Sequence, residues 1–124
     1  MDITTQNLYS SMTEKQRKEE MQSLRHQELK IKLEIQAHGM RIRALEESAL
    51  GIDDPLNAGI KPFIEISSAI AEEEMEIDRL AIQQHFVREK YFFLDGIEQA
   101  IAYEHSKQLL LDNMRKHPNP GGWK

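Results

Sequence analysis

Apolar residues recur along the chain at alternating intervals of three and four positions, in two long stretches. The first stretch runs from Met21 to Ile52 and the second from Phe63 to Ile101. This spacing keeps side chains on one face of an α-helix, and over several heptads it indicates coiled-coil packing. The pattern therefore predicts an all-α protein with two long helices. The residues expected in the helix seam are Leu24, Ile31, Ile35, Ile42, Leu45, Ile66, Ile70, Ile77, Leu80, Val87, Tyr91 and Leu94.

A loop is predicted at residues 51–61, which hold Gly51, Gly59, Pro55 and Asn57 and lead into Pro62. Glycine ends helices readily, and proline is tolerated in the first turn of the next helix. Helices joined by a short connection usually pack side by side, so the sequence predicts a long antiparallel helical hairpin. A parallel pairing of the long helices between chains stays open, because seam composition does not fix direction.

The ends of the hairpin are set by capping patterns. Ser11 with Glu14, or Thr13 with Gln16, fits a capping box and places the first helix start near residue 12. We therefore expect a flexible N-terminal arm over 1–11, a helical domain over 12–116 and a flexible tail over 117–124.

The C-terminal part of the second helix admits two interpretations. The heptad phase passes through Asp95-Gly96 without a break, which favours one helix extended to residue 116. The same dipeptide followed by Glu98 also fits a turn, after which 97–116 would pack as a third helix.

A second apolar stripe lies off the seam, and its candidate partner-binding members are Leu33, Met40, Phe86 and Phe93. Either 97–116 covers this stripe or other subunits do, and we expect a homo-oligomer because soluble monomers rarely expose so much apolar surface. The tail residue Trp123 is a further candidate, since an aromatic anchor on a tether suits docking into a pocket of a protein partner.

Charge is distributed unevenly although the net value is only −5. Residues 44–87 carry two basic and ten acidic side chains, whereas 1–43 carry eight basic and six acidic. The acidic run forms either a docking surface for a basic partner or an ordinary solvated helix face. An overall pI of about 5.5 argues against nucleic-acid binding. The candidate docking residues of the run are Glu72, Glu73, Glu74 and Glu76.

The sequence offers no pattern for catalysis, so we expect no catalytic, cofactor-binding or metal-binding residues. Cysteine is absent, and there is no glycine-rich phosphate loop or nucleophile motif. A di-metal bundle would need Glu-x-x-His, which does not occur. In an antiparallel hairpin, counting outward from the middle of the loop places His38 opposite Glu73–Glu74 and Glu28 opposite Gln84. Polar residues at such seam positions are expected to set the register of the two helices and not to bind a metal.

No apolar run approaches the roughly 20 residues of a membrane span, and the N-terminus lacks a signal-peptide pattern. We therefore expect a protein that is cytoplasmic or incorporated into a larger particle, with no membrane partner. The expected function is non-catalytic: a self-associating structural, assembly or adaptor protein, a phage virion or accessory component being one such type. One alternative is a small oligomeric inhibitor or chaperone for a basic surface, and another is a ferritin-like metal enzyme.

Overall fold

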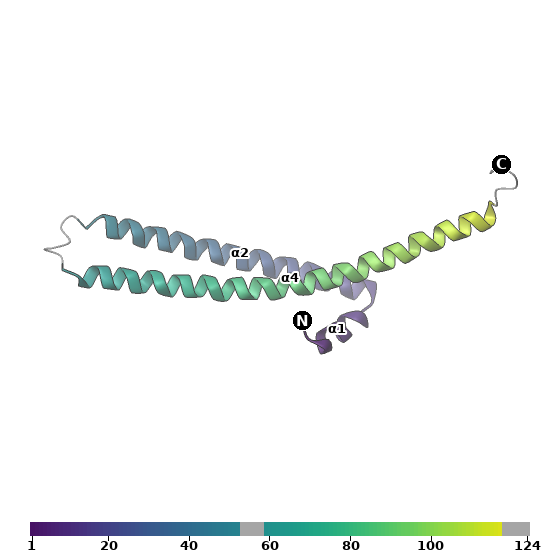
Figure 1. Cartoon of the computed structure of the whole chain (residues 1–124), viewed down its shortest axis with the longest axis horizontal. Coiled ribbons are helices and arrows are strands. Elements are labelled where there is room, and N and C mark those ends of the chain that lie inside the picture. The colour runs from purple at the N-terminus through teal and green to yellow at the C-terminus, as the bar shows by residue number, and fades with distance from the viewer. Residues whose placement is uncertain (53–58, 118–124) are drawn as a thin grey trace.

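The chain folds into a long helical hairpin with a short N-terminal helix packed beside it (Figure 1). The computed structural model describes residues 1–52 and 59–117. Within them lie three helices and no strand: α1 (Ile3–Ser10), α2 (Glu14–Leu50) and α4 (Lys61–Lys116). Because α2 and α4 run antiparallel, the predicted all-α hairpin is confirmed. The central part of the expected loop, 53–58, and the tail 118–124 lie outside the described residues.

The start of α2 is fixed by a capping box. The Thr13 hydroxyl accepts a hydrogen bond from the Gln16 backbone N–H at 3.2 Å, and the Gln16 side chain accepts one from the Thr13 N–H at 2.9 Å. These bonds satisfy backbone donors that have no partner within the helix. At its other end α2 stops at Leu50, and Gly51 is the C-cap residue.

The second long helix is continuous through Asp95-Gly96, the dipeptide at which the sequence also fitted a turn. α4 runs from Lys61 to Lys116 without a turn at 95–96. The Gln99 side-chain amide donates to the Asp95 carboxylate at 2.7 Å, one helical turn away, so Asp95 acts as a mid-helix residue and does not cap a new helix. The segment 97–116 therefore extends the second helix and does not fold back as a third one.

The hydrophobic core lies along the inner faces of the hairpin. Leu24, Leu80 and Leu94 are the most completely buried side chains, with 2 % or less of their surface exposed. Each contributes about 1.5–3 kcal/mol by leaving water. The seam residues nearer the loop, among them Ile42, Leu45, Ile66 and Ile70, are only partly buried.

The N-terminal residues, expected as a flexible arm, contain the helix α1. Its N-cap is Asp2, whose carboxylate accepts a hydrogen bond from the Thr5 backbone N–H at 2.7 Å. A helix of eight residues spans barely two turns, so no hydrophobic period could develop in the sequence.

α1 is held against the hairpin through Tyr9. Only 4 % of this side chain is exposed, and its ring centroid lies 6.3 Å from that of Phe93 on α4. Burial and the neighbouring Glu20 carboxylate raise the pKa of the Tyr9 hydroxyl to about 12. Through its packing on Phe93, Tyr9 extends the hydrophobic core toward the N-terminal end of α2.

Candidate protein–protein interface

The twelve residues expected in the helix seam lie in the shielded part of the hairpin, so they offer little surface to a partner. Five of them, Leu24, Ile31, Leu80, Val87 and Leu94, are buried. The other seven are partly buried: Ile35, Ile42, Leu45, Ile66, Ile70, Ile77 and Tyr91. A partner surface must therefore come from the remaining apolar residues.

One apolar stripe runs along the outer face of α2. Leu29, Leu33 and Met40 are 55–70 % exposed although each is a large hydrophobic residue. Leu29, Leu33 and Ala37 line a shallow groove of about 500 Å³, which is flanked by His26, Lys30 and Glu34. Since all six residues belong to one helix, the groove is an open surface and not an enclosed ligand site.

A second apolar stripe runs along the outer face of α4 within the hairpin. Met75, Ile82 and Phe86 are 70 %, 59 % and 53 % exposed. Phe93, which the sequence places with them, is partly buried against Tyr9 of α1. Phe93 therefore belongs to an intramolecular contact, whereas Leu33, Met40 and Phe86 remain exposed.

The C-terminal part of α4, residues 99–116, projects beyond the hairpin, and we call it the arm (Figure 1). Every residue of the arm is exposed, because α2 begins near the level of Glu98 and no described element lies farther along α4. Tyr103, Leu110 and Met114 are 60–67 % exposed. These three residues were not among the candidate site residues predicted from the sequence. Their positions outside the heptad spacing of the seam could have indicated a second apolar face.

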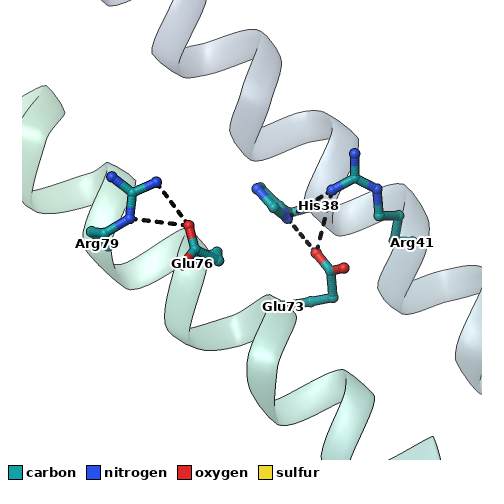
Figure 2. A network of polar contacts seen from close by, with 5 residues as sticks. All are labelled: His38, Arg41, Glu73, Glu76 and Arg79. Carbon is teal, nitrogen blue, oxygen red and sulfur yellow. Dashed lines mark hydrogen bonds and ion pairs between the residues drawn. The ribbon is translucent and has the colours of Figure 1, made fainter.

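The acidic run is divided between internal contacts and free surface. Figure 2 shows the Glu73 carboxylate directed at His38 of α2, with Arg41 at 3.6 Å. It also shows Glu76 paired with Arg79 of its own helix at 2.7 Å. The other two candidates, Glu72 and Glu74, are exposed. Within the described ranges, ion pairs therefore engage two of the four candidate residues, Glu73 and Glu76, and not the other two.

The Glu73 contact predicts a specific pH dependence of stability. The hydrogen bond from His38, and then the charges of His38 and Arg41, lower the pKa of Glu73 below 4.5. A carboxyl group with a depressed folded-state pKa stabilises the fold above its unfolded pKa and loses that contribution as the pH falls through the folded pKa. We expect Glu73→Gln to melt below the wild type at neutral pH, with the difference shrinking as the pH falls below the ordinary range of a glutamate. Thermal denaturation followed by circular dichroism measures this.

The matched control for that measurement is Glu74→Gln, which changes an exposed carboxylate one position along the same helix. Its melting temperature should follow the wild type at every pH. A constant difference between Glu73→Gln and the wild type from neutral to acidic pH would contradict the assigned role of the His38 contact.

Two contacts between α2 and α4 bear on the register counted from the sequence. His38 does face Glu73, as predicted. Glu28, expected opposite Gln84, instead accepts a hydrogen bond from Arg88 at 2.5 Å. Both side chains are long enough to reach across a helical turn, so an ion pair can form between positions that do not face each other.

No three potential metal-binding side chains lie close enough together to hold an ion in residues 1–52 and 59–117. Within the same ranges, none of the helices combines the length and the apolar composition that crossing a membrane requires. Trp123, the expected tail anchor, lies outside the described residues.

The chain matches no known protein-family model, no curated protein and no solved structure.

Proposed function

We propose that the protein is a non-catalytic helical assembly or adaptor component that associates with itself through the outer face of α4. The arm carries this proposal, because it is a long stretch of ordered helix whose every residue is exposed. Large apolar side chains recur along it although no part of the described chain covers them, the main ones being Tyr103, Leu110 and Met114.

Physical chemistry gives a reason for such a helix to have a partner. An isolated helix of fewer than about 12–15 residues is marginal in water, and even longer ones depend mostly on packing of an apolar face. The arm continues a helix that the hairpin has already nucleated, so it needs no nucleus of its own, but it gains no stability from packing within the described chain. Apolar side chains repeating on one face supply the missing contacts when another helix lies against them.

The alternative of an acidic inhibitor or chaperone has weaker support. Glu73 and Glu76 are engaged by His38 and Arg79, so a basic partner would compete with existing contacts for half of the proposed docking residues. The apolar stripes and the arm would also have no role in that function.

Absolute mass by light scattering behind a sizing column, over a wide concentration range, tests self-association. We expect the wild type to reach a fixed multiple of 14.5 kDa. Leu110→Glu should weaken association by about tenfold to a hundredfold, since burying a leucine contributes about 1.5–3 kcal/mol. Gln108→Glu is the matched control, because it adds the same charge to the arm at an equally exposed polar position. A monomer at every concentration would overturn the proposal.

A further inference from the structure

One face of α2, on the side turned away from the seam, repeats at intervals of three and four positions as a coiled-coil seam does. Its residues in chain order are Lys30, Leu33, Ala37, Met40, Ala44 and Glu47, and we call this face the α2 stripe. Large apolar side chains alternate in it with alanines, and a lysine and a glutamate form its two ends. Leu33 and Met40 are 56 % and 70 % exposed, so nothing in residues 1–52 and 59–117 covers the stripe.

The α2 stripe is complementary to itself when two copies run antiparallel. Helices paired in this way interlock in successive layers, each of which holds one side chain from either helix. If Ala37 of one copy shares a layer with Met40 of the other, then Leu33 shares the next layer with Ala44. Each large side chain therefore meets an alanine, which leaves room for it between the two helices. Leu33 and Ala37 also line the groove of about 500 Å³ on α2, so Met40 of the second copy lies at that groove.

The two ends of the stripe fit the same register. Lys30 shares the outermost layer with Glu47 of the second copy, so a base meets an acid at both ends of the pair. Leu29, which flanks the stripe, comes to lie beside Leu50 of the second copy. These two leucines are 55 % and 86 % exposed in the single chain. The pairing thus covers every large apolar side chain that is exposed on α2.

We propose that two copies of the chain pair antiparallel through the α2 stripe, with Ala37 of each beside Met40 of the other. The contact spans residues 27–50, a length of about 35 Å for a helix that rises about 1.5 Å per residue. A contact from residue i of one copy to residue j of the other is repeated from j to i, so the pairing closes as a two-fold dimer. It uses a different surface from the outer face of α4 and therefore goes beyond the self-association proposed for that face.

The side chains that flank the stripe are compatible with this register. Besides the leucines, the flanking pairs are Gln27 with Ser48, Glu34 with Arg41 and Gln36 with Arg43. None of these pairs sets two charges of the same sign against each other, and Glu34 with Arg41 combines opposite signs. Because like charges at facing positions are unfavourable, their absence from these pairs favours the register.

Other registers of the same face fit less well. A parallel pair in register sets Leu33 and Met40 each against its own copy, so the large side chains match there too. It also sets Lys30 against Lys30 and Glu47 against Glu47, and such like-charge contacts are unfavourable. An antiparallel pair shifted by one heptad sets Met40 against Lys30 in one direction and Ala37 against Glu47 in the other. Of these registers, only the proposed one joins apolar side chains with each other and base with acid.

Neither α1 nor the arm lies on the paired surface. α1 approaches α2 at Glu20, to which the Tyr9 hydroxyl donates a hydrogen bond at 3.4 Å, and Glu20 precedes the paired stretch 27–50. The arm extends α4 beyond the N-terminal end of α2 (Figure 1). An antiparallel dimer therefore leaves both arms exposed, with one arm projecting at each end.

Cysteine cross-linking tests the pairing on the intact chain, which contains no cysteine of its own. One variant carries Lys30→Cys and the other carries Glu47→Cys. Positions 30 and 47 share a layer of the proposed dimer, within reach of a disulfide, whereas the two copies of position 30 are about 25 Å apart along the helices. Under mild oxidation, the equimolar mixture should give at least about tenfold more disulfide-linked dimer than either variant alone. Non-reducing gel electrophoresis measures the yield.

A second measurement uses the apolar centre of the stripe. Leu33→Glu should raise the dimer dissociation constant at least about tenfold, because each dimer contains two copies of this leucine. Gln22→Glu is the matched control, since it adds the same charge at an exposed position of α2 outside 27–50. Sedimentation equilibrium on chains that also carry Leu110→Glu isolates the α2 contact from association through the arm, and circular dichroism checks that each variant stays helical.

The outcomes separate this pairing from the self-association proposed for α4. Cross-links that need the mixture and persist in Leu110→Glu chains would establish the antiparallel α2 contact. Cross-links as strong in each variant alone as in the mixture would overturn the antiparallel register. No cross-link from the mixture, while the wild type associates and Leu110→Glu weakens that association, would overturn the α2 pairing and leave the proposed function standing. Cross-links that need the mixture, in Leu110→Glu chains of unchanged mass, would support the α2 pairing and overturn the role of the arm.

Discussion

Replacing Leu80 with aspartate is expected to unfold the hairpin. Leu80 is 1 % exposed on the inner face of α4, within the core it shares with Leu24. Truncating a buried leucine costs about 2–5 kcal/mol, and an unpaired buried carboxylate adds a further penalty. The total is comparable with the whole stability of a small domain, about 5–15 kcal/mol. Far-UV circular dichroism at neutral pH should therefore show loss of most of the helical signal.

The control for this result is the same substitution on an exposed position of the same helix. Ile64 is 55 % exposed and lies in the first turns of α4, where a negative charge is favourable. Ile64→Asp should keep wild-type helicity and cooperativity. If Leu80→Asp also kept them, the inner seam would not be the structural core of the protein.

The hairpin could be predicted from the sequence because its determinants are local and repeated. Heptad spacing marks which face of each helix is apolar, and Gly51 and Pro62 mark where the chain can turn. The Thr13–Gln16 capping box was recognisable for the same reason, since it depends on two side chains three residues apart.

The helix α1 could not be predicted in the same way. Its stability depends on Tyr9 packing against Phe93, two residues far apart in the sequence that meet only after the hairpin has formed. An eight-residue segment without that contact carries too few apolar positions to reveal a helix.

The arm shows a different limit of sequence patterns. Ile101 continues the inner seam in phase, yet it is 48 % exposed because no part of α2 lies opposite it. A heptad repeat identifies the apolar face of a helix and does not say whether a second helix is present beside it. For this reason the sequence left open whether 97–116 extends α4 or folds back.

Removing the carboxylate of Glu98 is expected to be the most destabilising change among the ion pairs. Arg17 is buried, with 7 % exposed, and its Nε donates to Glu98 at 2.5 Å while Nη1 donates to the Met12 carbonyl at 2.5 Å. Glu98→Ala leaves a buried guanidinium without its counter-charge. Breaking a fully buried pair costs about 3–5 kcal/mol, and the partial exposure of Glu98 reduces this to about 1–3 kcal/mol. Chemical denaturation gives the free energy of unfolding directly.

Two further variants show whether the cost comes from the unpaired charge. Arg88→Ala breaks the more exposed pair with Glu28 and should change stability by about 0–1 kcal/mol. Adding Arg17→Met to Glu98→Ala removes the buried charge and should restore much of the lost stability, because an apolar side chain suits a buried site without a counter-ion. If the double variant were no more stable than Glu98→Ala alone, the loss would have to come from packing of the glutamate stem, and the buried charge of Arg17 would not be its cause.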